Sequence, residues 1–168
     1  MKYFFVYVLF FNMLLYSQTN EKTDSTAYYS SLSNSNIQNN NYKNALSYTQ
    51  KAIFYATKNK NIKDQAHQNL KLGEIYYNLK KYDDAIESFI KSATLLKNFD
   101  PSPDHAAVYY HLGSCYMKKE NFDSASLYFQ RAKSINDILK IPDTAELFNL
   151  QKALIYKSKN KLNSALSI

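Results

Sequence analysis

The sequence predicts an all-α protein built from stacked, antiparallel helix pairs. Alanines recur at a fixed interval of 40 residues, and they are Ala45, Ala85, Ala125 and Ala165. A small residue stands twelve positions before each alanine, and these residues are Ser33, Gly73, Gly113 and Ala153. The whole chain of 168 residues holds only two glycines and three prolines, a composition that disfavours a turn-rich β fold. A repeat of this length indicates a helical array in which each unit packs on its neighbours.

The first 17 residues differ from the rest of the chain. Lys2 is followed by an apolar run over residues 3–16 that is interrupted by Asn12. Such a run spans about 21 Å as a helix, which is less than the roughly 30 Å thickness of a hydrocarbon core. Ser17 supplies a small residue for cleavage before Gln18. We therefore predict a secretory signal peptide over 1–17, a short polar linker over 18–24, and a periplasmic or secreted location; an uncleaved N-terminal anchor is the alternative.

Helical periodicity divides residues 25–168 into about four helix pairs, of which the last is incomplete. The predicted helices cover residues 23–38, 42–57, 62–79, 82–98, 103–118, 122–139, 142–158 and 162 onward. Asn61 and Ser102 are suitable N-caps, and Pro103 suits a first helical position. Asp83-Asp84 corresponds to Asn44 and Asp123 in other copies, so we interpret these positions as caps of the second helices and not as paired catalytic carboxylates.

Two features point to tightly packed positions inside the array. Gly73 and Gly113 fall within predicted helices, where glycine costs about 1 kcal/mol relative to alanine. Their repetition predicts close packing of helix backbones. Cys115 takes the place that Ile75 and Ile155 hold one repeat away, so we expect a buried core thiol.

The repeating residues resemble the tetratricopeptide repeat family. The third copy carries most of the family pattern, with Tyr109, Leu112-Gly113, Tyr116, Ala125, Phe129 and Ala132. The second copy carries Leu72-Gly73, Tyr76, Ala85 and Phe89. The resemblance covers about residues 25–168 and implies a right-handed superhelix whose first helices line a concave binding face. The period of 40 exceeds the family's usual period of about 34 residues. Long repeats of this kind look like those of exported or sensory bacterial signalling proteins.

Neither the composition nor the motifs indicate catalysis. The lysines behind the formal charge of +7 are spread along the chain, a pattern that favours a solvated surface over nucleic-acid binding. His67, His105 and His111 lack metal-binding helical spacing, so we expect solvated or groove-lining histidines. No glycine-rich phosphate loop, nucleophile elbow or cysteine-rich zinc pattern occurs in the sequence. We predict no enzyme activity, no cofactor and no metal site.

The expected function is the binding of a protein or peptide through the concave face. The candidate residues for that face are Asn34, His67, Leu70, Lys71, Glu74, Tyr77, Tyr110, His111, Ser114 and Met117. For Leu70 and Tyr110, packing within the array is an equally good interpretation. The family's clamp for a C-terminal carboxylate is matched by Asn34 and Lys71 alone, so we do not predict binding of chaperone tails. The alternative function is a sensory input region of a bacterial transmembrane signalling protein, a histidine kinase or a transcriptional regulator.

The fourth pair reaches Ile168 after only seven residues of its second helix. An array needs a terminal helix with a polar outer face to cover its last apolar surface. We therefore expect either that the natural protein continues beyond Ile168 or that this end associates with a second copy.

Overall fold

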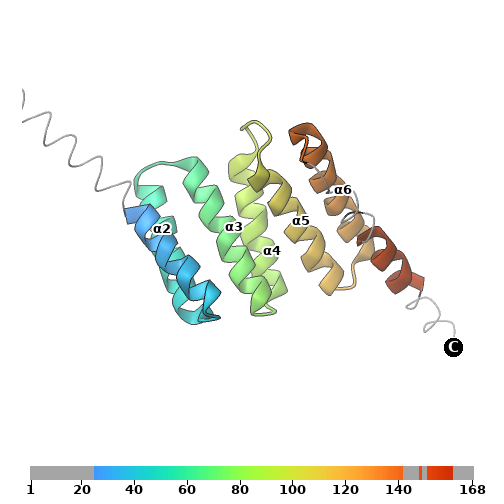
Figure 1. Ribbon diagram of the computed structural model, residues 1–168, viewed down its shortest axis with the longest axis horizontal. Coiled ribbons are helices and arrows are strands. Elements are labelled where there is room, and N and C mark those ends of the chain that lie inside the picture. Colours follow the sequence, from blue (N-terminus) through green and yellow to red (C-terminus); the bar gives the residue numbers. More distant parts are fainter. Residues whose placement is uncertain (1–24, 142–147, 149–150, 161–168) are drawn as a thin grey trace, which may run out of the picture. The chain divides into compact units, whose positions relative to one another are not determined.

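The computed structural model describes residues 25–141, 148 and 151–160, and within these residues the regular structure is helical throughout. A helix over residues 25–38 is followed by α2 (Tyr42–Lys58), α3 (Ile62–Asn78), α4 (Tyr82–Leu96), α5 (Pro103–Lys118) and α6 (Phe122–Leu139), as Figure 1 shows. Residues 151–160 are also helical. The all-α prediction is confirmed, and the predicted bounds of α2 to α6 differ from the observed ones by two residues at most.

The predicted end at residue 158 is too early, because the helix of residues 151–160 continues past it. The predicted segments 1–17, 18–24 and 162 onward lie outside the described residues.

Five of the helices end in the same kind of turn, and these turns recur at regular positions in the sequence. Five residues take a left-handed backbone with φ between 53° and 60°, and they are Asn40, Lys60, Lys80, Glu120 and Lys140. After α3, the amide of Lys80 donates to Tyr77 O at 2.9 Å and the amide of Lys81 donates to Tyr76 O at 2.9 Å. This pair of bonds is the Schellman motif, which satisfies the last helical carbonyls. These turns are 20 residues apart except between Lys80 and Glu120, where α4 and α5 are joined by a segment that contains Pro101.

The N-cap residues of the second helices lie two or three positions earlier than the sequence suggested. The Asn41 side chain accepts from the amide of Asn44, and the Asn121 side chain accepts from the amide of Ser124. Asp83 lies in the first turn of α4 and makes an ion pair with Lys119 on α5. Interpreting Asn44, Asp83-Asp84 and Asp123 as caps was therefore wrong.

The predicted caps of the first helices are confirmed in part. Asn61 Oδ1 accepts from the amide of Asp64 at 3.2 Å, and Asn61 Nδ2 donates to the Asp64 carboxylate at 2.6 Å. Ser102 is the N-cap residue of α5, but its hydroxyl bonds to His105 Nδ1 at 2.8 Å and not to the backbone. His105 is buried, and its Nε2 lies 3.1 Å from Leu96 O at the end of α4. His105 is therefore a structural residue, which corrects the expectation of a solvated or groove-lining histidine.

The chain divides into two compact units at residues 65 and 66, within α3. In the first unit the helix of residues 25–38 packs on α2 through small side chains. Ser33 and Thr49 are fully buried, and their hydroxyl oxygens lie 2.6 Å apart. At the surface of this unit Tyr29 stacks on Tyr55, with ring centroids 5.5 Å apart.

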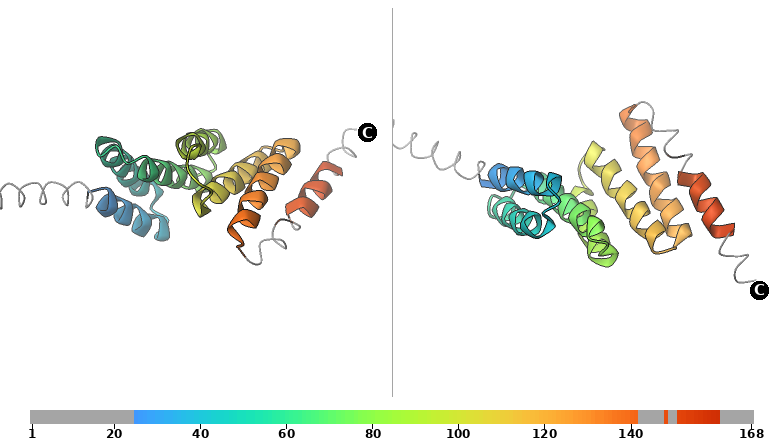
Figure 2. Two further views of the ribbon diagram at one scale, coloured as in Figure 1. Left: turned by 90° about the horizontal axis from the view of Figure 1, so that it is seen from above. Right: turned by 60° about the horizontal axis from the view of Figure 1, so that its bottom comes forward.

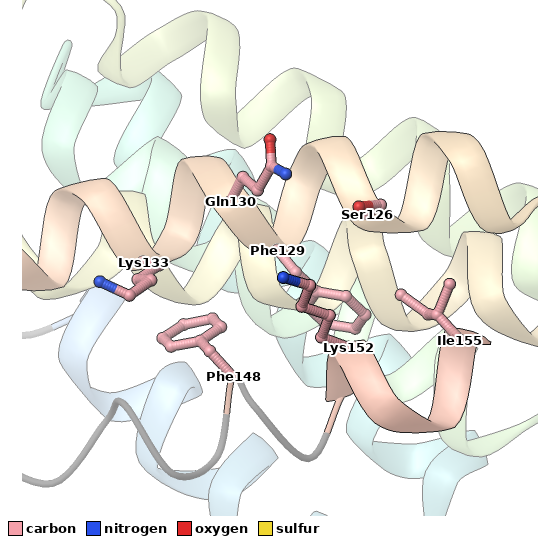
Figure 3. Close-up of a pocket in the computed structure, with 7 residues that line it drawn as sticks. All are labelled: Ser126, Phe129, Gln130, Lys133, Phe148, Lys152 and Ile155. Atoms are coloured by element: carbon pink, nitrogen blue, oxygen red, sulfur yellow. The ribbon is translucent and has the colours of Figure 1, made fainter. Parts of the chain in front are cut away.

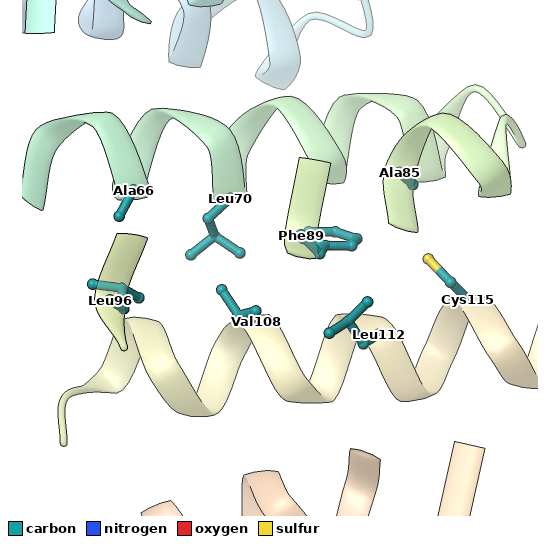
Figure 4. Packing of buried hydrophobic residues seen from close by; sticks show 8 residues of the cluster. All are labelled: Ala66, Leu70, Ala85, Phe89, Leu96, Val108, Leu112 and Cys115. Atoms are coloured by element: carbon teal, nitrogen blue, oxygen red, sulfur yellow. The ribbon is translucent and has the colours of Figure 1, made fainter. Parts of the chain in front are cut away.

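The second unit contains the larger core. Side chains of α3, α4 and α5 point toward one another in Figure 4, and the buried members of this cluster are Ala66, Leu70, Ala85, Phe89, Leu96, Val108, Leu112 and Cys115. The hydroxyl of Ser92 on α4 donates to Ala66 O at 2.8 Å, which satisfies a polar group inside this core. Within this unit α5 lies beside both α4 and α6, as the two views of Figure 2 also show.

Two sequence predictions concern positions in this core. Cys115 is fully buried, as predicted, and burial raises the pKa of its thiol to about 12. Gly73 and Gly113 do mark close contacts, but each glycine meets an aromatic ring, of Phe89 and of Phe129, and not a neighbouring backbone. Tyr156, which takes the place of Tyr116 one repeat onward, is 70% exposed.

Candidate functional site

The candidate face of the second unit lies on α3 and α5, and two histidine–carboxylate contacts join these helices. His67 Nδ1 on α3 is 3.0 Å from Asp104 Oδ2 on α5. Two helical turns further along, Glu74 Oε1 on α3 is 3.2 Å from His111 Nε2 on α5. The two contacts are reciprocal, because α3 supplies the histidine of the first pair and the carboxylate of the second. Both histidines predicted for the face therefore have an acidic partner on the neighbouring first helix.

The electrostatics of the first pair favour its charged form. The hydrogen bond to Asp104 raises the pKa of His67 above its ordinary value, and burial opposes this rise. The same hydrogen bond lowers the pKa of Asp104. Both side chains are partly exposed, at 48% and 34%, so solvent screens this interaction considerably.

Lys71 lies between the two pairs on α3, and it is not the free surface cation that the sequence suggested. The residue is only 6% exposed. Burial lowers the pKa of its ammonium group, while the charges of Glu74 and Asp104 oppose that change. Lys71 therefore serves the local charge balance of α3 and α5.

The remaining predicted residues are half-buried and mostly uncharged. The ring of Tyr77 meets the ring of Tyr82 edge-on, with centroids 5.6 Å apart, and burial raises the pKa of the Tyr77 phenol. Tyr110 packs against Phe129 at 5.5 Å, and its hydroxyl accepts from Gln151 Nε2 at 3.4 Å. Ser114 donates to Tyr110 O at 3.0 Å. These contacts support the packing interpretation for Tyr110, although part of its ring stays accessible.

The structure corrects one candidate residue and separates another. Leu70 is 5% exposed and belongs to the core cluster, so it is not available to a partner. Asn34 is exposed and belongs to the first unit, whereas the other nine candidates belong to the second. Met117 is half-buried and adjoins the cluster of Ala125, Phe129, Ala132 and Phe148.

Two residues of this face were not identified from the sequence. They are Asp104, the partner of His67, and Phe89, whose ring stacks on His111 at 5.2 Å with an interplanar angle of 6°. A signal for Asp104 was present, because His67 and Asp104 are separated by 37 residues and so are Glu74 and His111. A spacing of 37 is one repeat of 40 residues less three residues, which is about one helical turn. The partner therefore lies on the equivalent helix of the next repeat, about one turn nearer its N-terminus. The repeat pattern had already placed Phe89 in the core, and its side chain is fully buried beneath this face.

A hollow lies elsewhere in the second unit, between α6 and the helix of residues 151–160. Figure 3 shows its lining, and the cavity of about 210 Å³ is bounded by Ser126, Phe129, Gln130, Lys133, Phe148, Lys152 and Ile155. The equivalent interface of α4 with α5 has Leu112 in place of Lys152 and Ala93 in place of Lys133. Leu112 is buried, whereas Lys152 is exposed. The hollow is therefore explained by a polar side chain at a position that holds a core leucine one repeat earlier.

The described residues contain no group of three or more His, Cys, Asp or Glu side chains placed to hold a metal ion. In the same part of the chain no helix combines the length and the apolar character needed to cross a membrane.

Comparisons with known proteins agree with this architecture. A solved structure, the crystal structure of BtubC (BKLC) from P. vanneervenii, superimposes with a TM-score of 0.72 at 22% identity, over 84% of this chain and 59% of that one. The peptidyl-prolyl cis-trans isomerase CYP7 of Saccharomyces cerevisiae is 34% identical over 111 residues, which make up 64% of this chain and 26% of the yeast protein. The chain thus spans less than two thirds of either relative. The tetratricopeptide repeat family profile matches residues 65–136. These residues, with the helix pairs built on them, resemble the tetratricopeptide repeat family.

Proposed function

We propose that the chain is an exported, non-enzymatic module that binds a protein or peptide through the face of α3 and α5. Tetratricopeptide repeats serve in protein–protein interaction, and the family resemblance supports this general role. The observation that carries the finer proposal is the internal pairing of the charges on this face. The two histidines face Asp104 and Glu74, and Lys71 is buried among them.

Internal pairing defines the chemistry of the partner. A ligand with strong charges would have to compete with contacts that the protein already makes. The groups that remain partly accessible include the rings of Tyr77 and Tyr110 and the thioether of Met117, which are apolar and adaptable. An extended peptide or an amphipathic helix that presents apolar side chains fits this surface.

The name of the yeast relative does not extend to this chain. The aligned stretch makes up about a quarter of that protein, and the described residues of this chain form a helical array. We therefore propose a role in binding and not in isomerisation.

A display library of random peptides selected on the full chain tests the proposal. Peptides recovered with measurable affinity are titrated by fluorescence anisotropy against a Tyr77→Ala/Met117→Ala variant. Lys71 and Tyr110 are left unchanged, because Lys71 is buried and Tyr110 supports the fold through its contact with Phe129. Truncating two central apolar contacts should weaken binding by about tenfold or more.

The matched control removes exposed apolar side chains from the second helices. Ile90 and Leu127 are 45% and 48% exposed on α4 and α6, and their double alanine variant should bind the same peptides with unchanged affinity. Equal loss in both variants, or no loss in the Tyr77→Ala/Met117→Ala variant, would place binding elsewhere.

Export is tested separately. The basic start and the short apolar run predict a mature N-terminus at Gln18. N-terminal sequencing of the protein isolated from its native host checks this, and a chain that begins at Met1 in the cytosol would contradict export.

A further inference from the structure

Two reciprocal contacts of one chemical kind hold neighbouring first helices together. The His67–Asp104 pair lies near the N-terminal ends of α3 and α5, and the Glu74–His111 pair lies seven residues further along both helices. Two such contacts, about two turns apart, restrain both the separation and the relative rotation of the two helices.

We propose that these two pairs form a clasp between α3 and α5, and that its His67–Asp104 contact makes the clasp pH-responsive: the clasp tightens when the His67 imidazole is protonated and loosens when it is neutral. A neutral imidazole keeps one hydrogen bond to its carboxylate. Protonation converts that bond into a charge-assisted one, which is shorter and roughly twice as strong.

The charged and titratable groups that surround the clasp lie on both α3 and α5. Lys71 and Glu74 on α3 act on His67, together with Asp104 on α5. His105 on α5 adds to the effect on Asp104, and from α4 the ring of Phe89 stacks on His111. Protonation of His67 therefore adds one positive charge beside the carboxylates of Asp104 and Glu74 and the ammonium group of Lys71.

The direction of the pH effect follows from the first pair. The pKa of His67 is raised in the folded protein, so its contribution to stability is fully present below the ordinary histidine pKa of about 6.5. That contribution is lost as the pH rises through the raised value. Because the pKa of Asp104 is lowered, its carboxylate stays charged over this whole range. The stabilisation that this carboxylate contributes is lost only at much lower pH, as the carboxylate becomes protonated.

The face that the clasp holds is the candidate binding face. A binding face that is already ordered loses less conformational entropy on binding than a face that the ligand must order. Binding should therefore be tighter at pH 5.5 than at pH 8.0. This consequence rests on the proposed function, whereas the clasp itself does not.

The clasp is tested on the full chain without any ligand. In an NMR titration the His67 resonance should have a higher midpoint in the native protein than in Asp104→Asn. A double-mutant cycle of His67→Gln and Asp104→Asn, measured by urea unfolding, should show a coupling of about two- to fivefold in the unfolding equilibrium constant at pH 5.5. At pH 8.0 the coupling should fall markedly. The same cycle for His111→Gln and Glu74→Gln examines the second pair.

Asp100→Asn is the matched control, since Asp100 is an exposed carboxylate in the segment before α5. It should leave the His67 midpoint unchanged. An equal His67 midpoint in native protein and Asp104→Asn, or couplings that do not change with pH, would overturn the clasp and leave the proposed function intact.

The binding consequence is measured with a selected peptide that carries no titratable side chain. Its affinity should depend on pH in the native protein and lose most of that dependence in Asp104→Asn. Failure to select any peptide would count against the proposed function, while the ligand-free measurements would still decide the clasp.

Discussion

The ring of Phe89 occupies the space that a Cβ atom on Gly73 would need. A Cβ built on Gly73 would lie 2.5 Å from Phe89 Cε1, and one built on Gly113 would lie 2.8 Å from Phe129 Cδ1. Each pair is separated by 16 residues, and so are Ser33 and Thr49 in the first copy. There a hydrogen-bonded pair of small polar side chains replaces the glycine and the ring. The space between the two helices of a pair is thus filled in one of two ways. Either the second helix supplies a large ring opposite a glycine, or both helices supply a small polar side chain.

Replacing Gly73 with alanine should therefore destabilise the protein. In an open helix this change gains about 1 kcal/mol, but here the added methyl group must displace a buried ring, and overpacking costs about 1–3 kcal/mol. Replacing Gly73 or Gly113 with leucine should cost at least as much. Urea unfolding of the variants measures the effect.

A second substitution identifies the cause. Phe89→Leu alone should destabilise by creating space, but in the Gly73→Ala background it should cost much less than it does alone. Strictly additive effects of the two substitutions would show that the ring does not oppose the alanine.

Lys80→Gly should stabilise the protein by about 1 kcal/mol. Lys80 ends α3 with a φ of 60°, a left-handed conformation that side-chain-bearing residues adopt at a cost and glycine adopts freely. Thermal unfolding measures the gain. Lys91→Gly is the control, because Lys91 is exposed inside α4 and its replacement should cost about 1 kcal/mol. The same lysine-to-glycine substitution should thus raise the free energy of unfolding at position 80 and lower it at position 91.

Lys81→Asn should add a helix cap that α4 lacks. Lys81 is the N-cap residue of α4 and makes no side-chain capping bond, whereas Asn41 and Asn121 make one at the same position of α2 and α6. An asparagine side chain can accept the amide of the residue three positions on, which is worth about 0.5–1 kcal/mol. The reciprocal change, Asn121→Lys, should lower the free energy of unfolding by a similar amount. An unchanged midpoint in both variants would show that solvent caps these helices equally well.

Cys115 should react with a thiol reagent only when the core opens. Its side chain is fully buried, and its pKa of about 12 leaves almost no thiolate at pH 8. Labelling with a chromogenic disulfide at increasing urea concentration should follow the unfolding curve seen by circular dichroism. Rapid labelling of the native protein at pH 8 would contradict the burial of this residue.

The sequence alone determined the helices and the positions that pack most closely. Helix bounds depend on neighbouring residues, namely the apolar period, the caps and the turns, and the 40-residue repeat let four copies support one interpretation. Gly73 and Gly113 could be assigned to packed positions because glycine is unfavourable inside a helix unless close packing requires it. Cys115 could be assigned to the interior because the neighbouring repeats have isoleucine at the same position.

Only the tertiary structure decided which side chains face one another. Leu70 lies on the side of α3 that packs against α4 and α5, and Lys71 is buried as well. Which side of a helix is covered depends on how the helices cross, not on the helical period. The pairing of His67 with Asp104 joins residues 37 positions apart, so it requires the relative shift of two helices that a local pattern does not contain. For the same reason the partner of Gly73 was not a backbone but the ring of Phe89. Local interactions fix where each helix begins and ends, while the fit of side chains between helices fixes the surface that remains for a partner.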